Sequence, residues 1–304
     1  MRTACRGKAV RRAGGEWEGG RKSEEAARTV LRENRIALPP AYDPATVCLR
    51  PDPATGVVAF ARDARGRQQV YYTPDRVARR EGDRDAALLR AARSGALERG
   101  LRAAAADVRA DPLSWDGVRG LAVLVMDRLG VRLGKEVYLR TNGSRGASTL
   151  ACENVRLADR GATLSFRGKS GVLTERAVPA DLVAPLATLH RARQCARAFA
   201  KDRRLLADRS GREVRDRDVA AYVRERFGDG VTPKVLRAWS ANLTVLRRLI
   251  AGDDLADAIK VAAEHINNTP ATCRKSYVLR AVLEDPHAAV RGQRSPAAAL
   301  RRLA

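Results

Sequence analysis

The fold class of this chain is decided by residues 154–178, which read NVRLADRGATLSFRGKSGVLTERAV. Apolar residues at positions 162, 164 and 166 alternate with polar ones, as in a strand that buries one face. The run Gly168-Lys169-Ser170-Gly171 is rich in turn residues, and residues 172–178 supply a returning strand. The stretch therefore predicts a β-hairpin with Lys169 at its tip.

From about Asp83 onward, the chain around this hairpin has a helical pattern. After Asp111-Pro112, apolar residues recur at the i, i+3, i+4 and i+7 positions until Gly130, which predicts a helix. Thr232-Pro233 and Thr269-Pro270 each place Thr at an N-cap and Pro at the first helical position. The hairpin is thus an insertion in a mainly helical domain, which we place at residues 81–286.

A second β-rich region precedes the helical domain. Its apolar runs at 46–49, 57–60 and 70–72 are short, and turn residues separate them. We therefore predict an α+β fold, with a small β-rich N-terminal domain over 34–80 and the larger domain after it. Residues 1–33 are expected to be a flexible basic leader with at most a short helix around 23–33. Residues 287–304 are expected to be a disordered basic tail.

The charge of the chain points to a polyanionic partner. Lys and Arg number 58 against 35 Asp and Glu, a formal net charge of +23. Nucleic acid is the first candidate partner for so basic a protein. An anionic membrane surface is less suitable, because no long helix pairs a basic face with a bulky apolar one. No apolar run is long enough for a transmembrane helix.

The five cysteines are widely scattered and form no CxxC pair, and only three histidines occur. This usage fits a reduced, cytoplasmic protein and argues against a zinc site. Other familiar motifs also fail. The Gly15–Gly20 spacing resembles the start of a P-loop, but Arg21 stands where Lys is needed.

A scattered set of polar residues remains in ordered contexts. Taken singly, each basic residue is a surface charge or a phosphate contact, and Tyr277 is an ordinary aromatic. The set consists of Arg132, Lys169, Lys234, Arg237, Asn268 and Tyr277. The order of these residues along the chain favours a shared function over chance.

From about Leu38 to Leu283, the chain resembles the poxvirus-like branch of the type IB DNA topoisomerases, which has bacterial members. The resemblance rests on five stretches in order, with Asn268 and Tyr277 nine residues apart. These stretches are RDARGRQQVYY at 62–72, RLGKEVY at 132–138 followed by NGS at 142–144 and TL at 149–150, FRGKSG at 166–171, KVLRAW at 234–239, and NTP at 268–270 with RKSY at 274–277.

The resemblance implies the tyrosine recombinase/topoisomerase IB catalytic fold and an enzyme that relaxes positive and negative supercoils. Tyr277 would attack a DNA phosphorus and form a 3′-phosphotyrosine. Arg132, Arg237 and Asn268 would stabilise the transition state, since a guanidinium fork suits phosphate oxygens. Lys169 would protonate the leaving 5′-oxygen, with help from Lys234.

The same resemblance implies the partners. Candidate contacts with double-stranded DNA are Lys234, Arg62, Arg65, Arg67, Gln69, Tyr71, Tyr72 and Tyr138. No ATP, metal or other cofactor is expected, because the covalent link conserves the phosphodiester energy and the arginines supply positive charge. We expect a monomer clamped around DNA, in the cytoplasm at the nucleoid.

Two alternatives stay open. A tyrosine recombinase shares the chemistry, but that family typically has His three residues before its second Arg, where this chain has Lys234. A function as a non-enzymatic DNA- or RNA-binding protein would account for the positive charge, but not for the presence of these polar residues in this order.

Overall fold

The structure is a computed structural model that describes residues 9–10, 29–36, 48–52, 54–62, 68–197 and 202–304. The chain forms two compact units, Met1–Asp83 and Arg84–Ala304. Helix α2 (Pro74–Arg93) begins in the first unit and continues into the second.

The N-terminal unit is built on an antiparallel sheet in the order β1-β2-β3-β4. Its strands are β1 (Ala9–Val10), β2 (Cys48–Asp52), β3 (Val57–Arg62) and β4 (Gln68–Tyr72). Gly56 takes a φ of 63° in the turn before β3, a conformation that favours glycine. The three strands expected here are confirmed, and β1 is an addition. Residues 29–33 are helical, within the short helix expected near 23–33.

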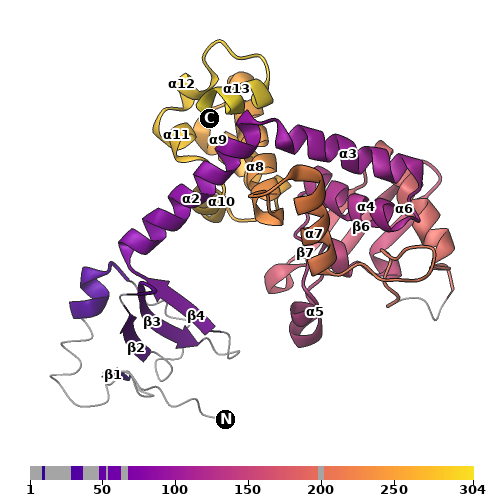
Figure 1. Cartoon of the computed structure of the whole chain (residues 1–304), viewed down its shortest axis with the longest axis horizontal. Helices are drawn as coiled ribbons and strands as arrows, with labels where there is room; N and C mark the ends of the chain where they lie inside the picture. Colours follow the sequence, from indigo (N-terminus) through magenta and orange to yellow (C-terminus); the bar gives the residue numbers. More distant parts are fainter. Residues whose placement is uncertain (1–8, 11–28, 37–47, 53, 63–67, 198–201) are drawn as a thin grey trace. The chain divides into compact units, whose positions relative to one another are not determined.

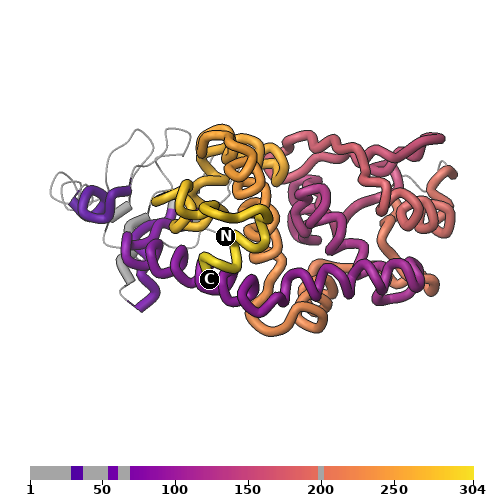
Figure 2. Tube along the Cα trace, turned by 90° about the horizontal axis from the view of Figure 1, so that it is seen from above, coloured from indigo at the N-terminus to yellow at the C-terminus, as the bar shows by residue number. Residues whose placement is uncertain are grey.

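The catalytic unit, as we call residues 84–304, is mainly helical. Its first helices are α3 (Ala96–Ala110), α4 (Trp115–Arg128), α5 (Glu136–Asn142), α6 (Ala180–Ala192) and α7 (Asp216–Phe227). They are followed by α8 (Pro233–Ile250), α9 (Leu255–His265), α10 (Pro270–Ser276), α11 (Arg280–Glu284), α12 (Pro286–Val290) and α13 (Pro296–Leu303). Within this unit, α11 to α13 lie at one end and α6 at the other (Figures 1 and 2).

The inserted hairpin is confirmed and gains a third strand. Strands β5 (Val155–Ala158), β6 (Gly161–Arg167) and β7 (Leu173–Ala177) form an antiparallel sheet in that order. Leu164 and Phe166 on β6 are buried, as their alternation predicts. Lys169 lies in the 3₁₀ turn Lys169–Gly171 between β6 and β7, where Ser170 takes a positive φ of 64°.

The core of the catalytic unit forms around α4 and α8. Helix α4 is buried on most of its circumference, as expected of a helix surrounded by others. Both predicted caps on α8 and α10 are present: the Thr232 hydroxyl accepts from the Val235 amide, and the Thr269 hydroxyl accepts from the Thr272 amide. These caps set where α8, which carries Arg237, and α10, which directly precedes Tyr277, begin.

The expectation of a disordered tail over 287–304 is wrong. This segment forms most of α12 and all of α13, and both helices pack on α8. Ala299 and Leu300 on α13 are fully buried. The burial of this short apolar face outweighs the basic composition that suggested a tail.

Candidate active site

Tyr277 lies immediately after α10, at the C-cap position. Its side chain is only 7% exposed. The Tyr277 hydroxyl accepts a hydrogen bond of 3.3 Å from Nη1 of Arg132, a residue 145 positions earlier in the chain. Two of the predicted catalytic residues therefore meet directly.

The surroundings of Tyr277 make its hydroxyl unusually acidic. Burial raises the pKa of Tyr277, but the nearby Arg237 and Arg132 cations lower it by more, and the balance is a pKa of about 8. The Arg237 guanidinium lies over the Tyr277 ring, 5.6 Å from its centre. A buried tyrosine held between two cations is poised to act as a nucleophile near neutral pH.

Arg237 is buried in α8, where it is 5% exposed. Its Nη1 donates to the carbonyl of Gly130, and its Nη2 donates to the carbonyl of Ile266 at 2.6 Å. The two Nη atoms of Arg237, which we expected to bind phosphate oxygens, thus donate to two main-chain carbonyls in this structure. The Nε atom of Arg237 is buried and has no hydrogen-bond partner among the described residues.

Asn268 completes the cluster from the loop between α9 and α10. Its Oδ1 accepts a 2.6 Å hydrogen bond from Nη2 of Arg132. The opposite amide atom, Nδ2, is buried and lacks a partner among the described residues. Arg237 Nε and Asn268 Nδ2 are therefore two buried donors without acceptors, on residues that contact Tyr277 or its partner Arg132. An unsatisfied buried donor costs about 1–3 kcal/mol, which an incoming oxyanion would recover.

Asn267 orients this loop, and sequence reasoning missed it. It takes a left-handed φ of 51° where α9 ends, and its side-chain Nδ2 donates to the Thr174 hydroxyl on β7 at 2.5 Å. The Asn268 amide then bonds back to the Ala263 carbonyl at 2.8 Å. Asn tolerates this conformation better than other non-glycine residues, so an Asn-Asn pair at a helix end was the available signal.

The structure does not bring Lys169 or Lys234 into hydrogen-bond contact with this cluster. Both side chains are exposed, and neither forms a hydrogen bond or ion pair with another described residue. Lys169 stands on the turn between β6 and β7, and Lys234 lies in the first turn of α8. The predicted general acid Lys169 and its predicted helper Lys234, a DNA-contact candidate, thus stay free at the surface of the catalytic unit.

The comparisons with known proteins bear on the whole of this arrangement. The family model for the eukaryotic DNA topoisomerase I catalytic core matches residues 100–280, more than half of the chain. This match covers Arg132, Lys169, Arg237, Asn268 and Tyr277. The chain belongs to the type IB DNA topoisomerases.

A curated relative gives the same assignment. The chain is 27% identical over 278 residues to DNA topoisomerase 1B of Acanthamoeba polyphaga mimivirus, which covers 86% of this chain and 81% of the viral protein. Among solved structures, the crystal structure of XerA recombinase aligns with a TM-score of 0.41 and 17% identity. That alignment covers 64% of this chain and 60% of the recombinase chain. The predicted enzyme class, a type IB DNA topoisomerase, is confirmed by the family match and the viral relative.

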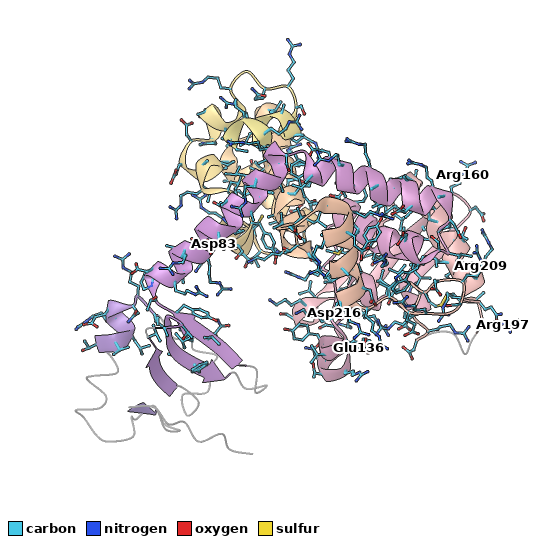
Figure 3. All side chains as sticks on the ribbon, viewed as in Figure 1. Asp83, Glu136, Arg160, Arg197, Arg209 and Asp216 are labelled. Atoms are coloured by element: carbon cyan, nitrogen blue, oxygen red, sulfur yellow. A yellow bond between two sulfur atoms is a disulfide. The ribbon has the colours of Figure 1, made fainter. Side chains whose placement is uncertain are left out.

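The predicted DNA contacts of this topoisomerase lie on both units. Tyr138 on α5 is 53% exposed. On β4, Gln69 is exposed, while Tyr71 and Tyr72 are half-buried. Arg62 ends β3. Arg65 and Arg67 lie outside the described residues. Elsewhere on the catalytic unit, arginines such as Arg160 and Arg209 point outward (Figure 3).

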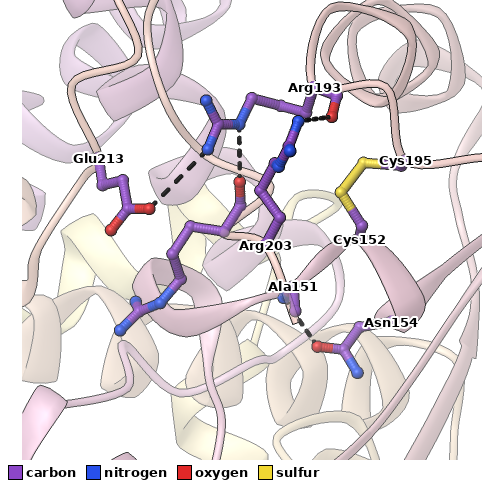
Figure 4. The surroundings of a disulfide bond; sticks show 8 residues. Ala151, Cys152, Asn154, Arg193, Cys195, Arg203 and Glu213 are labelled. Atoms are coloured by element: carbon purple, nitrogen blue, oxygen red, sulfur yellow. Dashed lines mark hydrogen bonds and ion pairs between the residues drawn. A yellow bond between two sulfur atoms is a disulfide. The ribbon is translucent and has the colours of Figure 1, made fainter. Parts of the chain in front are cut away.

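The expectation that the cysteines are all reduced is wrong for one pair. Cys152 and Cys195 form a disulfide, with their Cα atoms 5.1 Å apart (Figure 4). The bridge connects the turn before β5 to the turn after α6, so the loop it closes contains the whole β5–β7 sheet. The backbone here is also held by hydrogen bonds, among them Arg203 Nη1 to the Arg193 carbonyl at 2.9 Å. Cys273 is a free, buried thiol.

Among the residues that the structure describes, no helix is long and apolar enough to cross a membrane. Within the same part of the chain, no three His, Cys, Asp or Glu side chains group as a metal site would require.

Proposed function

We propose that this type IB topoisomerase relaxes positive and negative supercoils through a transient 3′-phosphotyrosine at Tyr277. The observation that carries the proposal is the cluster of the Tyr277 hydroxyl, Arg132, and the two unpaired donors Arg237 Nε and Asn268 Nδ2. These groups offer one nucleophilic oxygen and several positive or N–H groups to the same phosphate.

In the cleavage step, the Tyr277 oxygen attacks the phosphorus and loses its proton to solvent. A bond forms between phosphorus and the tyrosine oxygen, and the bond to the 5′-oxygen breaks. Negative charge concentrates on the non-bridging oxygens, where Arg132, Arg237 Nε and Asn268 Nδ2 donate. Religation reverses the step, with the 5′-hydroxyl as the nucleophile.

Lys169 is the proposed general acid for the leaving 5′-oxygen, with Lys234 assisting. The exposed position of Lys169 on a turn of positive φ supports a side chain that approaches DNA when it is bound. An alkoxide is a poor leaving group, and general acid catalysis typically contributes about 10²–10⁴-fold. The reaction needs no ATP, because the phosphodiester energy is kept in the tyrosyl link, and no metal, because arginines supply the positive charge.

The protein is further proposed to act as a monomer clamped around double-stranded DNA, in the cytoplasm at the nucleoid. The net charge of +23 supports a broad phosphate footprint. Arg62, Arg65, Arg67, Gln69, Tyr71 and Tyr72 are the proposed contacts of the N-terminal unit, and Tyr138 and Lys234 are those of the catalytic unit.

A plasmid relaxation assay tests the proposed function. Plasmids of positive and of negative supercoiling are incubated with the protein in EDTA without ATP. We expect both to be relaxed by the wild type and neither by Tyr277→Phe, which keeps the ring and removes the nucleophile. An absolute requirement for magnesium or ATP would overturn the proposal, and so would relaxation by the Phe variant.

A further inference from the structure

The backbone that carries Tyr277 receives its hydrogen bonds from an unusual source. Residues 277–279 link α10 to α11 without regular secondary structure. The amides of Tyr277 and Val278 bond back to the Cys273 carbonyl, as at many helix ends. Polar groups on either side of Tyr277 are paired instead with side chains from helices far away in the sequence.

The first set of side chains comes from α2. Arg84 donates from Nη1 to the Lys275 carbonyl at 3.0 Å and from Nη2 to the Val278 carbonyl at 3.1 Å. The guanidinium thus spans the nucleophile, with one bond before Tyr277 and one after it. Its neighbour Asp85 accepts from the Arg280 amide at 3.1 Å.

Arg84 and Asp85 also fix each other. Arg84 Nε donates to Asp85 Oδ1 at 2.7 Å, and the two side chains are only 9% and 16% exposed. Hydrogen bonds from a charged, mostly buried donor contribute more to stability than hydrogen bonds between neutral groups. A pair of this kind is suited to hold a short irregular segment in one conformation.

The second source is a single residue of α8, the fully buried Asn242. Asn242 Nδ2 donates to the carbonyl of Tyr277 itself at 2.9 Å, and Asn242 Oδ1 accepts from the Leu279 amide at 3.0 Å. Asn242 is 0% exposed. It lies five residues after Arg237 on the same helix. The helix that supplies a cation to the site therefore also holds the nucleophile's backbone.

We propose that Arg84, with Asp85 and Asn242, positions the Tyr277 nucleophile by clamping the backbone of residues 275–280. None of the three touches the reacting atoms in this arrangement, so they act through the placement of Tyr277. The inference rests on the proposed role of Tyr277 as the nucleophile. Placement matters because a shift of about 1 Å at a reacting group can cost about 10²-fold in rate.

The test compares Arg84→Met, which keeps much of the volume and loses both bonds, with Arg84→Lys, which keeps the charge. Arg90→Met is the matched control, because Arg90 is an exposed arginine on the same helix. The first measurement is the single-turnover cleavage rate at saturating enzyme. The second is DNA affinity, measured with each change placed in a Tyr277→Phe background so that no cleavage occurs.

We expect Arg84→Met to slow cleavage by about 10–100-fold, the loss that a small misplacement produces. DNA affinity should stay at the wild-type value. Arg84→Lys should recover part of the rate, because an ammonium can donate to these carbonyls without reproducing the planar fork. Arg90→Met should cleave like the wild type.

A pH profile separates positioning from general damage. If Tyr277 moves away from Arg132 and Arg237, it loses the cations that lower its pKa, and the rise of the Arg84→Met cleavage rate with pH should shift to higher pH. A variant that is only destabilised would cleave a smaller fraction of the DNA, and the pH at which its cleavage rate rises would not change. Thermal melting of each variant checks that it is folded. If Arg84→Met does not fold, Arg84→Lys and Asp85→Asn serve the same comparison.

Three results would overturn the inference: a wild-type cleavage rate in Arg84→Met, a rate loss fully explained by weaker DNA binding, or a slow folded variant whose pH profile is unshifted. Failure of the proposed function looks different. In that case the wild type itself forms no covalent adduct, or Tyr277→Phe still cleaves DNA.

Discussion

Nη2 of Arg132 donates a 2.6 Å hydrogen bond to Oδ1 of Asn268, while Nη1 of the same guanidinium bonds to the Tyr277 hydroxyl. Arg132 therefore bonds both to the proposed nucleophile and to the side-chain amide of Asn268 in the α9–α10 loop. Because Oδ1 faces Arg132, the Nδ2 donor of Asn268 is left for another acceptor. A phosphate oxygen is the acceptor that the proposed chemistry supplies.

Asn268 should matter less for cleavage than either arginine. A neutral amide makes a weaker bond to a developing negative charge than a guanidinium does. Asn268→Ala should therefore slow single-turnover cleavage less than Arg132→Ala or Arg237→Ala. Asn268→Asp is the sharper variant, since it keeps the acceptor for Arg132 but loses the donor and adds a negative charge. It should be slower than Asn268→Ala. An Asp variant as fast as the wild type would contradict the role of Nδ2.

The pH dependence of cleavage should follow the ionisation of Tyr277. The reactive form is the deprotonated one, so the rate should rise with pH and level off above the Tyr277 pKa of about 8. For an ordinary tyrosine, the rise would continue to about pH 10. Arg132→Gln removes one of the cations that lower this pKa. The cleavage rate of the variant should therefore rise at a higher pH than that of the wild type, whatever rate it reaches at the plateau. Identical profiles for the two proteins would show that Arg132 does not tune the nucleophile.

Lys169 can be tested with a changed leaving group. Lys169→Ala should slow cleavage of normal DNA by about 10²–10⁴-fold, the usual contribution of a general acid. On DNA with a bridging 5′-sulfur, the thiolate leaves without a proton, and the variant should cleave at close to the wild-type rate. Arg167→Ala removes another exposed cation from the same hairpin and should show no such rescue. A Lys169→Ala protein equally slow on both substrates would exclude Lys169 as the acid.

The Cys152–Cys195 bridge should contribute to stability, because it closes a loop of 43 residues. Cross-linking a loop of this size restricts the unfolded chain and typically stabilises a protein by about 2–4 kcal/mol. The Cys152→Ser, Cys195→Ser double variant should have a lower denaturation midpoint, and reduction of the wild type should match it. Alkylation of the unfolded, unreduced protein should label neither cysteine. Labelling of both would show that the bridge does not form.

The parts of the fold that sequence could predict are those with local signals. The hairpin at 162–178 has a period of two, and the Thr-Pro pairs at 232 and 269 mark helix starts by capping chemistry. The end of α10 directly before Tyr277 has no such local stop signal. The last two helices were missed, because α13 buries little more than Ala299 and Leu300 and its Arg-rich composition resembles a tail.

In the site, too, some features could be predicted from local sequence and others could not. Arg132, Arg237, Asn268 and Tyr277 could be found from family-like motifs, but their contacts could not. The Arg237 fork is held by carbonyls 107 and 29 residues away in sequence. Arg84 reaches a carbonyl 191 residues away, and no local pattern encodes such a contact.

In the proposed reaction, Tyr277 becomes linked to the 3′ end of the broken strand. The most direct measurement traps the covalent complex on DNA labelled at either side of the break, digests it with protease, and identifies the modified residue by mass spectrometry. We expect one adduct, on Tyr277, carrying the 3′-phosphate end, with a free 5′-hydroxyl on the other fragment. An adduct on any other residue, or one linked to the 5′ end, would contradict the proposed reaction.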